Sequence, residues 1–288
     1  MMDADPTEQL DRWPQVDRGG IEEIKQWLTT QPHLPAIKEH EMATFLHANY
    51  NNQEATRKTI ENYYTMRTSY TEFFTDRDIF SDPLQTALKI VMFTTLPGET
   101  KEGYKMAYTR LLTSDATDMN HLHVLKVLTM CMDLWIKLEG HANGHVLLSD
   151  MQGMHLGHMR KINMDAAKKQ MAYSQEALPV RLKQIHYLNV VPFMNRLMML
   201  VRPLLRKEVQ EMINMHVNID DSLYNSIPIE SLPNEYGGKA GTFEQLEKSF
   251  KDTLYAHSDW FREMESKNLV DESKRPPKPR RYMFGLFG

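Results

Sequence analysis

The chain has 288 residues, of which 41% are hydrophobic and 25% charged, so it can form a sizeable core and is not a disordered protein. Its net charge of -4 gives no overall positive field, which argues against nucleic acid as a partner. The single cysteine, Cys131, excludes an internal disulfide and a cysteine metal cluster, and it suits a reducing compartment.

The N-terminus and the most apolar segment predict neither export nor a membrane span. The first ten residues are acidic and no apolar run follows them, unlike a signal peptide. Residues 187–205 are the most apolar stretch, but they contain two arginines and two prolines. We therefore expect a cytoplasmic protein that contacts membrane surfaces only transiently.

The first 80 residues are predicted to form a helical module. Apolar residues recur at helical spacing from 21 to 28 and again from 55 to 66. No alternating strand pattern interrupts them. We therefore assign residues 1–80 to one helical N-terminal module.

Strand and helix patterns alternate from residue 104 onward, which predicts an α/β layer. The expected strands are 104–112, 145–149 and 183–191. The expected helices between them are 120–138 and 162–177. Gly140 and Gly144 end the first of these helices.

An amphipathic helix is predicted over 193–205. Asn195 and Arg202 lie on its polar side, and Pro203 is expected to interrupt or kink it. Its apolar face is formed by Phe193, Leu197, Leu200, Val201 and Leu204.

The last ordered element begins at Thr242, which forms a capping-box pattern with Gln245. One helix face then follows, formed by Phe243, Leu246, Phe250, Leu254 and Phe261. Residues 266–288 are predicted to be a disordered, basic, Pro-rich tail. Its basic residues and the apolar run 282–287 suit either contact with an anionic membrane or a merely solubilising role.

Catalytic motifs are incomplete, so we predict a protein that is not an enzyme and needs no cofactor or metal. Residues 237–242 lack the first glycine and the magnesium-binding hydroxyl of a phosphate-binding loop. Residues 40–44 lack the second histidine of a zinc-protease helix. The histidines His141, His145, His155 and His158 straddle a strand and a loop, which favours scattered side chains over a metal site.

Three segments together resemble the CRAL-TRIO family of lipid-binding proteins, including its tocopherol-transfer and retinaldehyde-binding members. The first, 144–153, is a strand that ends in Asp-x-x-Gly; the second is 178–189, leading into Arg202 and Pro203. The third is the string Leu-Pro-Asn-Glu-Tyr-Gly-Gly at 232–238. The resemblance assigns residues 81–265 to the lipid-binding domain.

The resemblance implies a mixed β-sheet with helices on one face and a mobile lid helix over a lipid pocket. The amphipathic segment 193–204 falls where the family has the lid. By position, the rest of the pocket wall is formed by Leu125, Leu128, Thr129, Met132, His145, Leu147, Ser149, Ile162, Gln170, Tyr173, Leu178 and Val180. Judged from the residues alone, an ordinary core position is the favoured interpretation of each.

Four polar residues in this wall depart from the tocopherol-binding members. They are His145, Ser149, Gln170 and Tyr173. Because buried polar side chains need partners, they predict a ligand with a hydroxyl, carbonyl or ester group, or ordered water in its place.

A basic surface cleft that binds phosphoinositide headgroups is a second implied feature. Arg181 and Lys183 match two of its basic positions, while Arg206 and Lys207 lie close to others that do not match. A solvated surface is the alternative interpretation.

The sequence therefore predicts a monomeric carrier that moves a tocopherol, retinoid, carotenoid or related lipid between membranes. The alternative function is a lipid-responsive sensor or interaction module, since both functions need the same pocket. The expected partners are the small hydrophobic ligand and a membrane surface that contains phosphoinositides.

Overall fold

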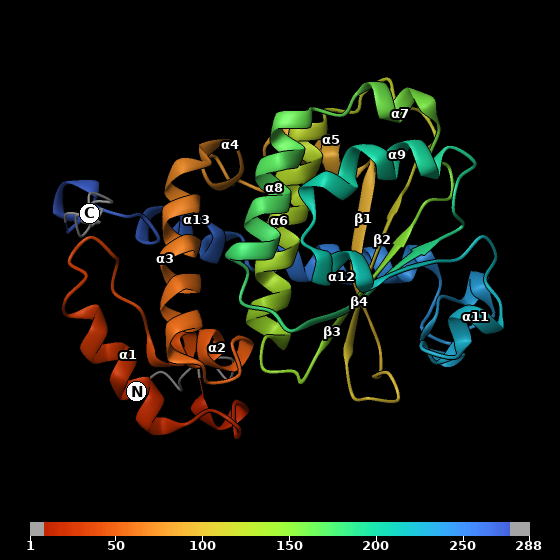
Figure 1. Ribbon diagram of the computed structural model, residues 1–288. Helices are drawn as coiled ribbons and strands as arrows, with labels where there is room; N and C mark the ends of the chain where they lie inside the picture. The colour runs from red at the N-terminus through yellow and green to blue at the C-terminus, as the bar shows by residue number, and fades with distance from the viewer. Residues whose placement is uncertain (1–8, 277–288) are drawn as a thin grey trace, which may run out of the picture.

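The computed structural model describes residues 9–276, which form a helical part and a five-stranded sheet flanked by helices (Figure 1). The sequence predicted this mixed α/β architecture correctly. Within the described residues, no helix combines the length and the apolar character needed to cross a bilayer. The same residues contain no group of three or more His, Cys, Asp or Glu side chains placed to hold a metal.

The N-terminal part contains only helices, as the sequence predicted. They are α1 (Arg18–Leu28), α2 (Glu39–Ala48), α3 (Gln53–Ser69), α4 (Thr71–Phe74) and α5 (Asp82–Leu88). Asp17 caps α1 and Asn52 caps α3, because each side chain accepts a hydrogen bond from a backbone N–H of the first turn. Ile24, Leu46 and Ile60 are fully buried in the core that α1, α2, α3 and α4 share, whereas α5 packs with the sheet and α6.

The sheet has the strand order β1-β2-β3-β4-β5. The strands are β1 (Val91–Leu96), β2 (Lys105–Leu111), β3 (His145–Asp150), β4 (Leu182–Leu188) and β5 (Ile213–Met215). β1 runs antiparallel to β2, and the other neighbours are parallel. The three predicted strands are present, whereas β1 and β5 were missed. β1 is buried on both faces and shows no alternation, and β5 has only three residues.

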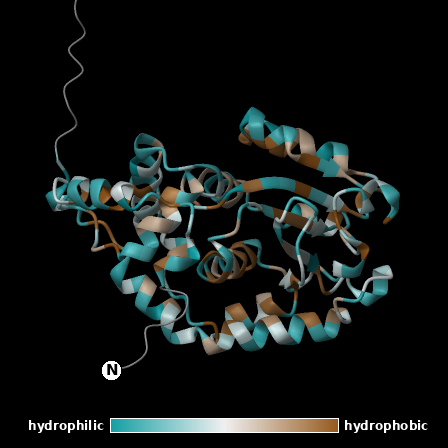
Figure 2. Cartoon of the chain, turned by 90° about the horizontal axis from the view of Figure 1, so that it is seen from below, coloured by the Kyte–Doolittle hydropathy of each residue, from teal (hydrophilic) through white to brown (hydrophobic). Residues whose placement is uncertain are grey.

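One face of the sheet packs against α6 (His121–Glu139), whose N-cap is Asn120. Phe93, Ala107 and Leu147 belong to the same hydrophobic cluster as this helix. Figure 2 looks along α6 and shows hydrophobic residues predominating in this helix at the centre of the molecule. Beside it, α8 (Met164–Glu176) packs against both α6 and α3, so it connects the sheet layer to the N-terminal part.

The opposite face of the sheet packs against α12 (Phe243–Ala256) and the segment before it. Val146 and Leu148 share a buried cluster with Leu246 of α12. The predicted capping box is present, since Thr242 accepts from the Gln245 amide and Gln245 accepts from the Thr242 amide. Because side chains alternate along each strand, residues on this face cannot reach the face that α6 covers.

The predicted amphipathic helix is α9 (Met194–Val201), followed by a 3₁₀ turn (Arg202–Leu204). Pro203 lies in that turn and ends the regular helix, as expected. The short helices α7 (Leu156–Arg160), α10 (Lys207–Glu211) and α11 (Asp221–Tyr224) complete the domain. In Figure 1, α9 lies in front of the sheet and α12 lies behind it.

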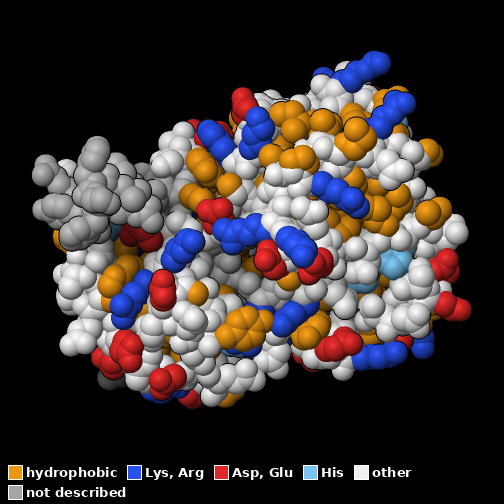
Figure 3. Space-filling view, in the orientation of Figure 1, with side chains coloured by type: hydrophobic (Ala, Val, Ile, Leu, Met, Phe, Trp, Pro, Cys, Tyr) orange, Lys and Arg blue, Asp and Glu red, His pale blue; other side chains and the backbone are white. Residues whose placement is uncertain are grey.

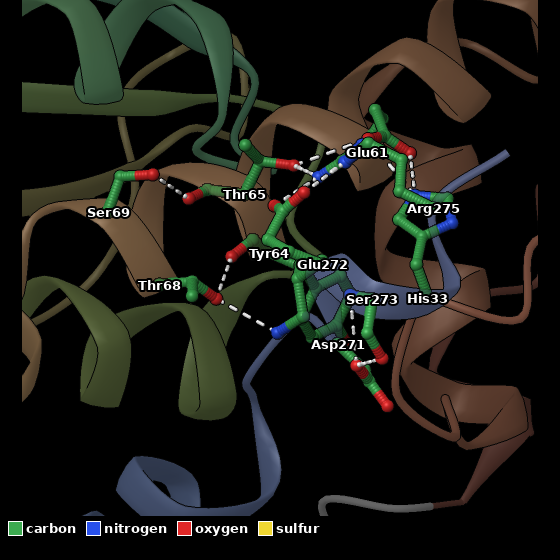
Figure 4. A network of polar contacts seen from close by, with 11 residues as sticks. His33, Glu61, Tyr64, Thr65, Thr68, Ser69, Asp271, Glu272, Ser273 and Arg275 are labelled. Atoms are coloured by element: carbon green, nitrogen blue, oxygen red, sulfur yellow. Dashed lines mark hydrogen bonds and ion pairs between the residues drawn. The ribbon is translucent and has the colours of Figure 1, made fainter. Parts of the chain in front are cut away.

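The C-terminal segment differs from the prediction in two ways. The single helix expected after Thr242 is two helices, because α12 ends at Ala256 and α13 (Ser258–Lys267) contains Phe261. Residues 266–276 are also ordered against the N-terminal part. Figure 4 shows Arg275 paired with Glu61 of α3. The rest of the tail, with the apolar run 282–287, lies outside the described residues.

Candidate functional site

The candidate site lies on the sheet face toward α9. On this face β3 contributes Leu147 and Ser149, and β4 contributes Ile185 and Tyr187. Leu147 is the register partner of Ile185, and Ser149 is the register partner of Tyr187, so the four side chains point to the same side. Leu147, Ser149 and Tyr187 are only partly buried although they lie in the middle of a sheet. The sheet therefore leaves them accessible to a ligand.

A methionine cluster on α9 covers the ends of these strands. Met194 and Met198 are 3% and 4% exposed and pack together with Met151, which follows β3. Tyr187 and Ile213 border the same cluster. Methionine side chains are flexible and polarizable, so this cover can adapt to an irregular ligand. These methionines were not predicted from the sequence, although the i, i+4 spacing of Met194 and Met198 was a signal for them.

The lid residues predicted from the sequence are distributed around α9. Leu197 borders the methionine cluster. Three others are partly buried: Phe193, Val201 and Leu204. Leu200 is 47% exposed, beside Met199 at 74%, so the prediction that Leu200 packs on the inner face is wrong for this conformation. Met194 and Met198 instead form the buried cluster that Tyr187 and Leu197 border.

The predicted pocket residues on α6 divide between two cores. Leu128 packs toward the sheet, Leu125 packs toward the N-terminal part, and Met132 borders both. Thr129 donates to the Leu125 carbonyl and lies 3.1 Å from the side-chain oxygen of Gln170. The Thr129 hydroxyl is therefore satisfied by the Leu125 carbonyl within its own helix, and Gln170 of α8 lies against it.

His145 does not line the candidate site as predicted. Its side chain is 1% exposed, its Nε2 lies 2.9 Å from the Glu139 carbonyl, and its ring meets Trp135 edge to face. Burial lowers the pKa of His145 to about 4, so the ring is neutral near pH 7. The residue is on the expected sheet face, but Trp135 of α6 covers it.

Tyr173 also belongs to another region. It is fully buried, and its hydroxyl accepts a hydrogen bond from Arg67 of α3 at 3.0 Å. Leu178 and Val180 likewise pack against the N-terminal core. The prediction for Tyr173 is wrong because its side of α8 packs on α3, and those for Leu178 and Val180 are wrong because the chain after α8 packs against the N-terminal core. Ile162, in the turn before α8, is partly buried.

Asp150 connects the segments that carry the family resemblance. Its carboxylate accepts hydrogen bonds from the hydroxyls of Tyr108 and Tyr236, each at 2.5 Å. It also accepts from the side chain of Asn189 and the backbone of Gln152, each at 2.9 Å. Burial and the nearby carboxylate raise the pKa of Tyr108, so its hydroxyl remains a donor. Asp150 is therefore a structural acceptor that joins three loops.

The four residues of the predicted basic cleft lie at two separate places. Arg181 is 8% exposed, donates to the His47 carbonyl at 2.6 Å and stacks on Tyr50, so it is not a free surface cation. Lys183 donates to the Tyr50 hydroxyl at 2.7 Å. At the other place, Arg206 pairs with Glu176 and Lys207 lies near Glu211.

A cleft of about 180 Å³ lies elsewhere, between the N-terminal part and α13. Tyr63, Tyr64 and Trp260 line its walls, and Lys267 and Glu263 form an ion pair at its edge. Its charges balance, so nothing in the cleft selects one kind of ligand.

Comparison with known proteins gives two family matches. The CRAL/TRIO domain matches residues 91–238, and the Pinta-like, UBA domain matches residues 14–84. The solved structure of Sfh5 superimposes with a TM-score of 0.54 at 13% identity, covering 89% of this chain and 99% of Sfh5. That likeness supports the fold.

Curated relatives are distant. The human alpha-tocopherol transfer protein-like protein is 24% identical over 218 residues, which cover 75% of this chain and 63% of the relative. Clavesin-1 of Rattus norvegicus is 22% identical over 237 residues, which cover 80% of this chain and 66% of the relative. The match thus spans less than two thirds of the first relative's length. Since the CRAL/TRIO match covers just over half of the 288 residues, this chain belongs to the CRAL-TRIO family.

Proposed function

We propose that this protein binds a small hydrophobic ligand between its sheet and α9 and carries it from one membrane to another. Membership of the CRAL-TRIO family supports lipid binding and transfer in general terms. The observation that carries the proposal is the amphipathic α9, which places buried methionines over the partly buried residues of β3 and β4. Tocopherol, a retinoid, a carotenoid or a related lipid are the candidate ligands.

The energetics favour a carrier that selects its ligand by the shape of the site and a few polar contacts. Burying about 500 Å² of apolar ligand surface stabilises the complex by roughly 12 kcal/mol relative to water. Relative to a bilayer this contribution nearly vanishes, because lipid tails are also apolar. Selective extraction must therefore come from shape and from a few polar contacts. A modest shift of α9 toward a position away from the sheet is then sufficient to release the ligand.

The outer side of α9 supports contact with a membrane. Met199 is 74% exposed and Leu200 is 47% exposed, and both Arg196 and Arg202 of the same segment are exposed. Figure 3 shows hydrophobic side chains gathered over α9, with Lys and Arg side chains among them. This combination suits insertion of apolar groups below anionic headgroups.

Phosphoinositide headgroups are proposed to bind only to the accessible cations of the predicted cleft. Lys183, Arg206 and Lys207 are the candidates, since Arg181 is buried. Replacing these three residues by alanine is expected to weaken binding to phosphoinositide vesicles and to leave binding to neutral vesicles unchanged. Equal binding of the variant and the unaltered protein to both vesicles would remove phosphoinositides from the proposal.

Mass spectrometry of an organic extract is the first test, using protein purified without detergent from its native source. One enriched lipid, together with rapid transfer of that lipid between vesicles, is the expected result for a carrier. A bound lipid that does not exchange would favour the sensor alternative. A protein that carries no lipid and takes none from vesicles would contradict both functions.

A further inference from the structure

The most exposed large hydrophobic side chain within residues 9–276 is a methionine of α9. Met199 is 74% exposed, whereas Met194 and Met198 on the same helix are 3% and 4% exposed. Consecutive residues of an α-helix are separated by about 100° around its axis, so Met199 lies on a different side of α9 from both buried methionines. One helix therefore carries an accessible thioether and two shielded ones.

The accessible thioether can react directly with a peroxide. Its sulfur attacks one peroxide oxygen, the O–O bond breaks, and the second oxygen leaves as water with both peroxide protons. Two electrons pass from the sulfur to the peroxide, and the product is a methionine sulfoxide, which is polar and chiral. Methionine sulfoxide reductases reverse the oxidation with electrons from thiols, so the modification is not a permanent loss.

The residues around Met199 are those of the proposed membrane contact. Leu200 follows it and is 47% exposed, and Arg196 and Arg202 are exposed three residues before and after it. Residues three apart are neighbours on a helix surface, and the backbone of Arg202 is still helical. Apolar side chains flanked by arginines in this way suit insertion below the headgroups, with the guanidinium groups at headgroup level.

Oxidation of Met199 opposes that insertion for a physical reason. The thioether is only a weak hydrogen-bond acceptor, whereas the sulfoxide oxygen is a strong one that loses its water partners when it enters the acyl region. At the protein surface the same oxygen can accept from the N–H groups of a neighbouring arginine. The oxidised side chain is therefore stabilised in solution relative to the membrane.

We propose that Met199 is a redox modification site, at which oxidation by a peroxide to the sulfoxide weakens the attachment of α9 to a membrane. This inference rests on the proposed function and adds a form of regulation to the same surface. Met194 and Met198 stay reduced because they are buried, so the cover over the strands keeps its apolar side chains. The modified protein therefore keeps its fold and loses membrane affinity.

The first test follows which methionines react. The full chain is treated with hydrogen peroxide, and the oxidation of each methionine is measured by peptide mapping with mass spectrometry. Met199 should be oxidised before Met194 and Met198, whose oxidation requires opening of the fold. Adding phosphatidylcholine vesicles that contain phosphatidylserine should slow the oxidation of Met199, because the bilayer then covers it. Met215, which is 39% exposed on β5, is the internal control and should react at the same rate with or without vesicles.

The second test measures binding to the same vesicles by sedimentation before and after peroxide treatment. The unaltered protein should bind about three- to tenfold more weakly after treatment, and the reductases should restore its affinity. Each variant is compared with itself. Met199→Leu should lose no affinity on treatment, because its side chain cannot be oxidised in this way. Met215→Leu, the matched control, should lose as much as the unaltered protein.

Four results would each overturn the inference while the carrier function stands. They are oxidation of the buried methionines before Met199, no protection of Met199 by vesicles, an unchanged affinity once Met199 is oxidised, and an equal loss of affinity in Met199→Leu. If the untreated protein does not bind the vesicles at all, the proposed membrane contact fails and the inference fails with it.

Discussion

Asp150 shows how one residue can hold a motif together. Its carboxylate accepts from Tyr108, Tyr236, Asn189 and Gln152 while it is 4% exposed. Asp150→Asn replaces one accepting oxygen by a donor that faces other donors. We expect this change to lower the free energy of unfolding by about 1–3 kcal/mol, measured by urea denaturation. Tyr108→Phe removes only one of the four contacts and should lower the free energy of unfolding by less. If both variants are as stable as the unaltered protein, the network contributes nothing to stability.

Polar residues of the site were predicted with mixed success, and the reason is physical. Ser149 was identified from strand alternation, which depends only on the local period of the chain. His145 and Tyr173 were misplaced because Trp135 covers the first and Arg67 binds the second. Tyr187 was missed because its pairing with Ser149 depends on the strand register, which the sequence of one strand does not contain.

At the scale of elements, Gln175 attaches the segment that follows α9 to α8. Its side chain donates to the Leu204 carbonyl at 2.9 Å and accepts from the Arg206 amide at 2.7 Å. Gln175→Ala removes both hydrogen bonds. If the proposed carrier function holds, we expect faster transfer of bound lipid to acceptor vesicles, by about three- to tenfold, because the position of α9 over the sheet loses support.

Gln210→Ala is the control for this substitution. Gln210 donates to the carbonyls of Arg202 and Leu205, which belong to the same segment, so its loss does not detach the segment from α8. Transfer by this variant should match that of the unaltered protein. Acceleration by both variants alike would mean that general loosening, and not the attachment to α8, limits release.

The exposed side of α9 gives a second prediction for this element. Met199→Ser together with Leu200→Ser removes exposed apolar area without touching the buried Met194 and Met198. We expect several-fold weaker binding to anionic vesicles in a sedimentation assay and no loss of thermal stability. Leu156→Ser, on the exposed part of α7, is the comparison for loss of an apolar side chain elsewhere. Undiminished vesicle binding by the double variant would exclude this side of α9 as the membrane contact.

Elements were more predictable than their packing partners. The strands 104–112, 145–149 and 183–191 and the helix 193–205 carry their period in the local sequence, and all four are present. The face of α9 that turns inward depends on which side chains fill the space above Tyr187, so Leu200 was misassigned. The order of residues 266–276 depends on distant contacts with α3, which composition cannot show.

At the scale of the whole molecule, Asp133 of α6 joins the two parts of the chain. Its carboxylate lies 2.9 Å from Arg67 and 2.7 Å from Arg77, and all three side chains are buried. Burial opposes the charge, but the two arginines keep the pKa of Asp133 below its usual value. Asp133→Asn leaves two buried cations without a carboxylate and should cost about 3–5 kcal/mol of unfolding free energy.

The matched control for Asp133→Asn is Asp252→Asn. Asp252 pairs with Lys248 at 2.6 Å, but both side chains are well exposed. Exposed ion pairs contribute little, so the unfolding free energy should change by less than about 0.5 kcal/mol. Similar losses in the two variants would contradict a special role for the buried cluster.

Acid sensitivity follows from histidines spread over the whole fold. Burial, aided by nearby cations or histidines, lowers the pKa values of His141, His145 and His186 to about 4. In the unfolded chain these groups titrate near 6.5. Between pH 6.5 and 4 the unfolded state therefore binds more protons than the folded state. The free energy of unfolding should fall as the pH is lowered through this range and should be fully restored above it.

The histidine contribution can be tested with His186→Asn. His186 contacts His216 through Nδ1 at 2.9 Å, and an asparagine side chain can place a polar atom near the same position without titrating. Urea denaturation at pH 7, 6 and 5 should show a smaller loss of stability toward acid in this variant than in the unaltered protein. The control is His155→Asn, because His155 is exposed. This variant should keep the same pH dependence of stability as the unaltered protein. A pH dependence that is identical in all three proteins would assign the acid sensitivity to carboxylates, and the buried pair of His186 and His216 would then be a neutral part of the core at every pH tested.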